Sequence, residues 1–99
     1  MAQFDFYRAP DGVGYVLDCQ ADIFSHLNTR LVVPLLSSDR GLEPARHLNP
    51  VFSLGGTDHV LVTQFAASIP ASELDQPVGS LAGERYAILN ALDFVIAGI

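Results

Sequence analysis

The side chains that could carry out chemistry are few, and their spacing matches no catalytic or metal-binding pattern. His26, His47 and His59 lack a second His or Cys at the spacing of a zinc site. The Ser-Ser-Asp run at 37–39 places hydroxyls beside a carboxylate, but such a run is more typical of a turn or a helix cap than of an activated nucleophile. We therefore expect a binding protein without a metal, a cofactor or an enzymatic activity of its own.

The charge of the chain argues against direct binding to nucleic acid. Asp and Glu number 11, the basic residues number 5 and are all arginine, and the formal net charge is −6. Phosphate backbones are bound by basic surfaces, which this composition does not provide. Arg40, Arg46 and His47 fall close together. This cluster is suited to an acidic peptide, and a solvated loop is the alternative.

The overall composition predicts a single domain, residues 1–99, that associates with itself. Hydrophobic residues make up 49% of the chain and charged residues 16%, below the roughly 25% of an average soluble domain. A surface so poor in charge favours a homo-oligomer, in which a second copy covers apolar area. The alternative is a monomer whose surface is polar but uncharged.

Cys19 and the N-terminal residues indicate a cytoplasmic protein. Cys19 is the sole cysteine, so we expect no disulfide within the chain and a thiol packed as a small apolar side chain. The first residues contain neither the basic nor the apolar segment of a signal peptide. No apolar run approaches the ~20 residues that a membrane-spanning helix requires.

Alternating apolar residues and turn residues predict a set of strands. The strands are expected over residues 3–8, 13–19, 30–36, 51–54 and 59–65. Turn residues at 9–12 and 55–58 join the first two and the last two strands into hairpins. Pro34 lacks an N–H and should lie at an edge, a bulge or a strand end. An irregular connection is expected over 68–79.

A helix that begins near Gly83 and continues to the end of the chain is the other strong signal. One face carries an apolar stripe, which we expect to pack on the core or on a partner: Ile88, Leu89, Leu92, Val95, Ile96 and Ile99. A second, mixed face is available to a partner: Tyr86, Asn90, Asp93 and Ala97. Strands followed by one helix predict an α+β or small-barrel fold.

Five stretches, in this order along the chain, resemble the motifs of one protein family. They are QFDFY at 3–7, YVLDCQAD at 15–22 (an LDVQSD segment with Cys for Val and Ala for Ser), TRLVVPL at 29–35, ASIP at 67–70, and a terminal helix with Arg85, Ile88, Ala91, Leu92, Asp93, Gly98 and Ile99. Together they extend over nearly the whole chain. The sequence thus resembles the CcdB toxins of plasmid and chromosomal toxin–antitoxin modules.

This resemblance implies a fold, a target and an antitoxin. CcdB-like proteins are homodimers with an SH3-like small barrel of antiparallel strands, a mainly β type of α+β fold, extended by a C-terminal α-helix. They bind the A subunit of DNA gyrase and trap the gyrase–DNA cleavage complex, without catalysis of their own. A CcdA-like antitoxin wraps the toxin with a disordered C-terminal segment and removes it from gyrase.

The gyrase contact of the family lies at the end of the helix, which implies Asn90, Asp93, Ala97, Gly98 and Ile99 in this chain. The best-known plasmid member ends in Trp-Gly-Ile, whereas this chain ends in Ala-Gly-Ile. Because an indole ring often anchors an interface, we expect its absence to weaken gyrase binding by ~2–4 kcal/mol. Two alternatives therefore stay open. One is a diverged CcdB-like protein that binds an antitoxin but inhibits gyrase weakly or not at all. The other is an endoribonuclease toxin of the related MazF or Kid type, against which the absence of lysine argues.

Two further surfaces are expected. The antitoxin should bind around the first turn and the arginine-containing loop, at Pro10, Asp11, Gly12, Arg40, Arg46 and His47. The two helices of a dimer should meet near its symmetry axis through Leu92, Val95 and Ile96.

Overall fold

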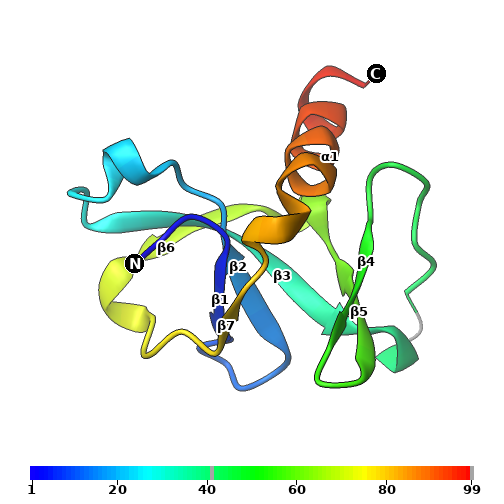
Figure 1. Ribbon diagram of the computed structural model, residues 1–99, viewed down its shortest axis with the longest axis horizontal. Helices are drawn as coiled ribbons and strands as arrows, with labels where there is room; N and C mark the ends of the chain where they lie inside the picture. The colour runs from blue at the N-terminus through cyan, green and yellow to red at the C-terminus, as the bar shows by residue number, and fades with distance from the viewer. Residues whose placement is uncertain (41, 99) are drawn as a thin grey trace.

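One antiparallel sheet forms the frame of the fold (Figure 1). The computed structural model describes residues 1–40 and 42–98 of the chain. Within them seven strands pair in the order β4-β5-β3-β2-β1-β7, and β6 also pairs with β3. The strands are β1 (Asp5–Arg8), β2 (Tyr15–Asp18), β3 (Thr29–Ser37), β4 (Val51–Leu54), β5 (Thr57–Leu61), β6 (Ala67–Pro70) and β7 (Gly79–Ser80), and the helix α1 (Arg85–Ala97) follows them. This is the mainly β, α+β arrangement that the sequence predicted.

The central strand, β3, pairs along both of its edges. One edge pairs with β2 over residues 32–35 of β3. The other edge pairs with β6 over residues 29–32 and with β5 over residues 35–37. Because one edge of β3 serves two strands in succession, the sheet curls into a half-barrel.

Pro34 lies where β3 changes partners. Its carbonyl oxygen accepts a hydrogen bond of 2.9 Å from the Val62 N–H, and its nitrogen has no hydrogen to donate. Residues 33 and 34 have no strand partner on that edge in the register. The missing N–H therefore costs no ladder hydrogen bond, which explains how a proline is tolerated inside a strand of 9 residues.

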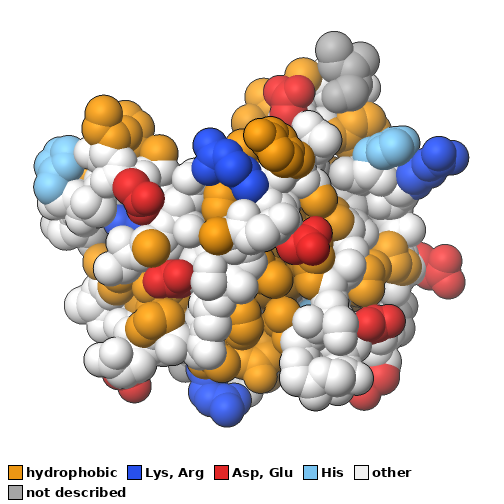
Figure 2. Space-filling model, in the orientation of Figure 1, with side chains coloured by type: hydrophobic (Ala, Val, Ile, Leu, Met, Phe, Trp, Pro, Cys, Tyr) orange, Lys and Arg blue, Asp and Glu red, His pale blue; other side chains and the backbone are white. Residues whose placement is uncertain are grey.

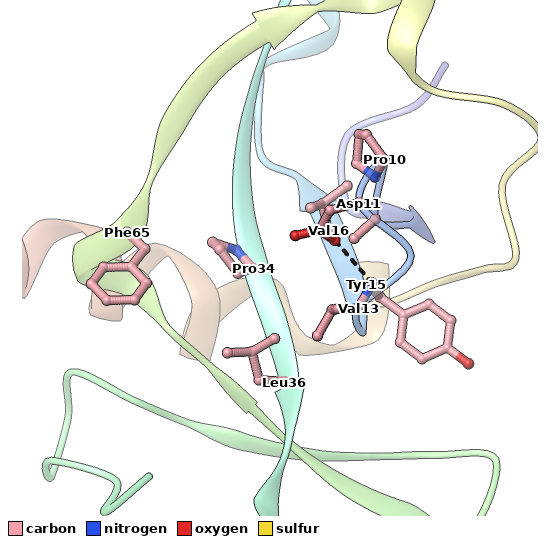
Figure 3. A pocket seen from close by; sticks show the side chains of 9 residues that line it. Pro10, Asp11, Val13, Tyr15, Val16, Pro34, Leu36 and Phe65 are labelled. Carbon is pink, nitrogen blue, oxygen red and sulfur yellow. Dashed lines mark hydrogen bonds between the residues drawn. The ribbon is translucent and has the colours of Figure 1, made fainter. Parts of the chain in front are cut away.

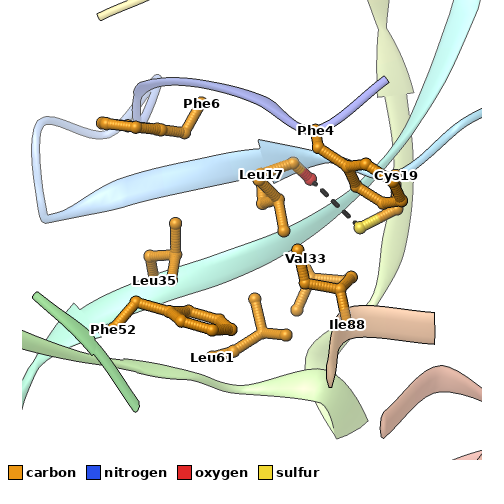
Figure 4. Close-up of a cluster of buried hydrophobic side chains, with 9 residues drawn as sticks. All are labelled: Phe4, Phe6, Leu17, Cys19, Val33, Leu35, Phe52, Leu61 and Ile88. Atoms are coloured by element: carbon orange, nitrogen blue, oxygen red, sulfur yellow. Dashed lines mark hydrogen bonds between the residues drawn. The ribbon is translucent and has the colours of Figure 1, made fainter. Parts of the chain in front are cut away.

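The main core lies inside the curl, where α1 meets the sheet (Figure 4). Its buried members come from the strands, from residues next to the strand ends and from the helix: Phe4, Phe6, Leu17, Cys19, Val33, Leu35, Phe52, Leu61 and Ile88. The alternation predicted for the first two strands is thus confirmed for Phe4, Phe6, Leu17 and Cys19. Val13, at the start of the second predicted strand, is exposed and precedes β2.

A second, smaller cluster lies on the opposite face of β1, β2 and β3. Its buried apolar members are Tyr7, Val16, Val32 and Leu74. An ion pair between Asp18 and Arg30 is buried on the same face, with Arg30 Nη2 at 2.6 Å and Nε at 2.9 Å from Asp18 Oδ2. Leu74 belongs to the connection between β6 and β7. This connection therefore covers the second face of β1, β2 and β3, which the alternating pattern of these strands would otherwise leave exposed to solvent.

Several strand boundaries differ from the prediction. The second hairpin turns at Gly55 and Gly56, which both have left-handed φ values, so β5 begins at Thr57. β5 ends at Leu61, and Thr63–Phe65 forms a short 3₁₀ helix instead of continuing the strand. β6 and β7 lie in or beside the segment predicted to be irregular. They were missed because each is short and pairs with a strand distant in sequence.

The C-terminal half of α1 projects beyond the sheet (Figure 1). Ile88 and Ala91 are buried, whereas Val95 is 39% and Ile96 83% exposed. Val95 and Ile96 therefore do not pack on the core of the single chain, which leaves a partner as the other expected contact for this part of the apolar stripe. Ile99, the last member of the predicted stripe, lies outside the described residues. No helix in the described part of the chain is long and apolar enough to cross a membrane.

Candidate functional site

The projecting half of α1 presents the predicted gyrase-binding residues to solvent. Asn90, Asp93, Ala97 and Gly98 are all exposed, and Ile99 lies outside the described residues. Asp18–Arg30 is the only ion pair among the residues that the structure describes. The Asp93 carboxylate therefore has no cationic partner within that part of the chain and is available to another molecule.

A hollow of about 260 Å³ beside this helix face is lined by His47, Asn90, Asp93 and Phe94. The rings of His47 and Phe94 meet edge to face, with their centroids 6.1 Å apart. His47 has a φ of 67°, a left-handed conformation that is uncommon outside glycine and asparagine. The structure thus brings His47, predicted to contact the antitoxin, to Asn90 and Asp93, predicted to contact gyrase.

The position of His47 is set by a hydrogen-bonded turn. Asn49, which is buried, accepts the Ala45 N–H at 3.0 Å and donates through Nδ2 to the Leu61 carbonyl at 3.0 Å. The hydroxyl of Thr63, also buried, donates to the Leu48 carbonyl at 2.6 Å. These bonds attach the turn to the region that follows β5. Sequence reasoning missed Asn49 and Thr63, because their partners are set by the tertiary fold.

The first hairpin lines a separate hollow of about 370 Å³ (Figure 3). The predicted antitoxin-binding residues Pro10 and Asp11 line it together with apolar side chains that include Val13 and, on the opposite side (Figure 3), Phe65. The Asp11 carboxylate accepts the Val13 N–H at 2.9 Å, which closes the turn. Gly12 has a φ of 80°, as the turn requires.

The predicted antitoxin-binding set is therefore divided between hollows. Pro10 and Asp11 line the hairpin hollow, whereas His47 lines the hollow beside α1. Arg40 and Arg46 are exposed, and neither forms an ion pair with a described residue. An extended partner would have to contact several separate sites to engage the whole set.

An exposed apolar patch after β2 was missed by sequence reasoning. Ile23 is 76% and Phe24 50% exposed, and Leu27 and Leu31 are exposed beside them. Phe24, Leu27 and Leu31 line a hollow of about 420 Å³ with buried Cys19 at its edge. Hydrophobic side chains gather at the tip of the segment that follows β2 and at the tip of α1 (Figure 2). The available signal was the apolar trio at 23, 24 and 27, which lies in a segment too short to form a core helix.

His59, Ser37 and Asp39, which were first considered for chemistry, have structural partners. His59 is buried in β5, with Nδ1 at 2.9 Å from the Thr57 carbonyl oxygen. The Ser37 hydroxyl donates to the Asp39 carboxylate in an exposed turn. Burial raises the pKa of the Cys19 thiol to about 12, so the thiolate is suppressed. No group of three or more His, Cys, Asp or Glu side chains among the described residues could hold a metal ion.

Solved structures confirm the barrel-like fold. An endoribonuclease from a mycobacterial species superposes with a TM-score of 0.78 at 15% identity, over 97% of this chain and 90% of that chain. The toxin MazF-mt6 of Mycobacterium tuberculosis superposes at 0.68 with 22% identity, over 93% and 95%. The MazE–MazF structure from Deinococcus radiodurans gives 0.68 at 12% identity, over 97% and 93%. At these identities the similarity establishes the fold alone.

The family comparison is more specific than the fold comparison. The sequence model of the CcdB protein family matches residues 3–98. This match includes every motif that carried the resemblance except for Ile99 at its end. The chain therefore belongs to the CcdB family, and it is a toxin of the toxin–antitoxin class.

Proposed function

We propose that this toxin binds the A subunit of DNA gyrase, traps the gyrase–DNA cleavage complex, and is neutralised by a CcdA-like antitoxin. The family match over residues 3–98 is the observation that carries the proposal. The exposed end of α1 supports it, because Asn90, Asp93 and Ala97 are free to contact a large partner.

Endoribonuclease activity is the second candidate, and the MazF-type solved structures favour it. The charge of the chain argues against it. Arg30 is buried in its ion pair with Asp18, which leaves four arginines and no lysine at the surface of a chain with a net charge of −6. RNA binding relies on cationic contacts to phosphate, so a gyrase-directed toxin is the better reading.

Homodimer formation is part of the proposal. Val95 and Ile96 are exposed apolar side chains on the projecting half of α1, and Leu92 is half-buried beside them. A second copy packed against this surface would cover the apolar area that the sheet leaves open. The two helix ends would then present one composite surface to gyrase.

The antitoxin proposal rests on charge and on exposed apolar hollows. One of the similar solved structures is described as an endoribonuclease in complex with its cognate antitoxin. In this chain Arg40 and Arg46 are exposed on an otherwise acidic protein. A disordered acidic segment would associate through them and order as it binds.

Charge reversal tests this contact. The double variant Arg40→Glu, Arg46→Glu should slow association with the antitoxin and reduce the salt dependence of the association rate. Arg8→Glu is the control, because Arg8 is also exposed but lies outside the predicted set. If the wild type and the double variant associated with the antitoxin at equal rates, Arg40 and Arg46 would not be part of the antitoxin interface.

Two assays in parallel decide among the three functions. The purified protein is tested in a gyrase supercoiling and DNA-cleavage assay and in an RNA-cleavage assay. Inhibited supercoiling with trapped, cleaved DNA and intact RNA is the expected result. Cleaved RNA with unaffected gyrase would identify a MazF-type enzyme. Binding to an antitoxin with neither activity would identify a diverged CcdB-like protein.

A further inference from the structure

We infer that a buried water molecule bridges the Tyr7 hydroxyl and Nη1 of Arg30, and that it completes the hydrogen bonding of the Asp18–Arg30 ion pair. The site lies on the face of β1, β2 and β3 that is opposite the main core. The inference goes beyond the proposed function and does not depend on which molecule the toxin binds.

The two atoms are buried and have no partner within the described part of the chain. Tyr7 is 1% and Arg30 0% exposed. Neither the Tyr7 hydroxyl nor Arg30 Nη1 has a hydrogen-bond partner among the residues that the structure describes, and no other buried side-chain nitrogen or oxygen of those residues lacks one. Buried polar groups in folded proteins are nearly always hydrogen-bonded, and a charged group left unpaired is strongly destabilising. Both atoms therefore need a further partner.

The register of the sheet places these side chains on one face. Tyr7 pairs with Val16, and Asp18 lies two residues further along β2, where a side chain points to the same face. Asp18 pairs with Val32, and Arg30 lies two residues before Val32 on β3. Nε and Nη2 of Arg30 both donate to Asp18 Oδ2. Nη1 is therefore the guanidinium nitrogen that the carboxylate does not bind.

The charges around the phenol decide which class of ligand fits. The pKa of Tyr7 is raised first by burial and then by the charges of Asp5 and Asp18, and Arg30 lowers it. The phenol is therefore protonated at neutral pH and can both donate and accept a hydrogen bond, whereas Arg30 can only donate. A cation would be repelled by Arg30, and an anion would be repelled by Asp18. A small neutral molecule that accepts from Arg30 and exchanges a hydrogen bond with Tyr7 satisfies both groups, and water is the molecule of this kind that protein interiors hold.

The connection between β6 and β7 closes the site. β6 pairs with β3 and β7 pairs with β1, so residues 71–78 pass from one edge of this face to the other. Leu74 of this connection packs with Tyr7, Val16 and Val32. A water beneath the connection exchanges with solvent only when the connection moves, so it is a lasting part of the fold.

Crystal structures of the full chain and of its Tyr7→Phe variant test the site directly. The wild type should show an ordered water about 2.7–3.2 Å from both the Tyr7 hydroxyl and Arg30 Nη1. Tyr7→Phe removes one partner but keeps the ring that packs with Leu74, so the variant should fold and the water should leave this position. A direct hydrogen bond from Arg30 Nη1 to the hydroxyl or to a carbonyl of residues 71–78, or an ion at this position, would overturn the inference.

Urea denaturation tests whether the water connects Tyr7 to Arg30. Tyr7→Phe should raise the equilibrium constant for unfolding about tenfold, because Arg30 Nη1 loses the water. In the double variant Asp18→Asn, Arg30→Met, the same substitution should change this constant by less than ~3-fold, because no guanidinium remains to hold the water. Tyr86→Phe is the matched control and should change nothing, since Tyr86 is 79% exposed.

The outcomes of the denaturation experiment separate a bridge from an isolated hydroxyl. If Tyr7→Phe leaves the unfolding constant of the wild type unchanged or lowers it, no water satisfies the hydroxyl, and the inference fails. If Tyr7→Phe has an equal effect in the wild type and in the double variant, the hydroxyl acts independently of Arg30, and the bridge is also overturned. Neither measurement involves gyrase, RNA or an antitoxin, so the result is separate from that of the proposed function.

Discussion

The buried ion pair between Asp18 and Arg30 joins two of the motifs that carry the family resemblance. Arg30 donates twice to one oxygen of Asp18, and the other oxygen accepts the Gln20 N–H at 3.1 Å. We expect Arg30→Leu to lower the free energy of unfolding by about 3–5 kcal/mol, because it leaves a buried carboxylate unpaired. Urea denaturation measures this loss.

Two controls accompany this prediction. Arg46→Leu removes an exposed arginine and should change the free energy of unfolding by less than ~0.5 kcal/mol. The double variant Asp18→Asn, Arg30→Met removes both charges and should recover most of the stability. A double variant as unstable as Arg30→Leu would show that packing, and not the unpaired charge, explains the loss.

Cys19 offers a second test at the residue scale. Its pKa is raised to about 12, first by burial and then by the charge of Asp18. Because alkylation requires the thiolate, iodoacetamide at pH 8 should leave the native protein unmodified and react once urea unfolds it. The stability that the neutral thiol contributes is complete below about pH 9 and declines as the pH rises toward 12. Rapid labelling of native protein, followed by mass spectrometry, would contradict the burial of Cys19.

At the scale of elements, local patterns predicted those features that depend on neighbouring residues. Alternation and turn residues located both hairpins, and the apolar spacing located α1. Two features depend on segments distant in sequence and could not be predicted from local patterns. One is the pairing of β6 with β3. The other is the exposure of Val95 and Ile96, which extend past the sheet. The hollow at His47 belongs to the same class, since Asn49 fixes the turn through the distant Leu61 carbonyl.

The exposed end of α1 leads to a prediction about association. Ile96→Ser should raise the dissociation constant of the proposed homodimer about tenfold or more, because a buried aliphatic side chain contributes ~1.5–3 kcal/mol. The helix itself should remain folded, since Ile96 is 83% exposed in the single chain. Analytical ultracentrifugation measures the constant. Tyr86→Ser is the matched control, because Tyr86 is 79% exposed at the other end of the helix. If both substitutions raised the dissociation constant equally, Ile96 would not be part of the dimer interface.

At the scale of the whole molecule, the fold and the family point in different functional directions. The overall fold is similar to those of endoribonucleases and MazF toxins at identities of 12–22%, whereas the sequence motifs belong to the CcdB family. The acidic surface and the projecting helix end are properties of this chain. An acidic surface and an exposed helix end suit contact with a protein better than contact with RNA. The chemistry of the surface, and not the shared fold, therefore indicates which molecule this toxin binds.

The end of the helix provides the sharpest test of that target. Ala97 is exposed at the last position of α1, where the best-known family member carries tryptophan. Ala97→Trp should strengthen binding to the gyrase A subunit by ~1–3 kcal/mol, because an indole ring adds a large contact surface without disturbing the core. Calorimetry and the supercoiling assay measure the gain, and Tyr86→Trp, at the exposed start of the helix, should show none.

Deletion of residues 97–99 should abolish gyrase binding while the thermal midpoint stays nearly unchanged. If wild type leaves supercoiling untouched at high micromolar concentration and Ala97→Trp restores nothing, gyrase is not the target, and the chain is a diverged toxin whose helix end contacts another protein.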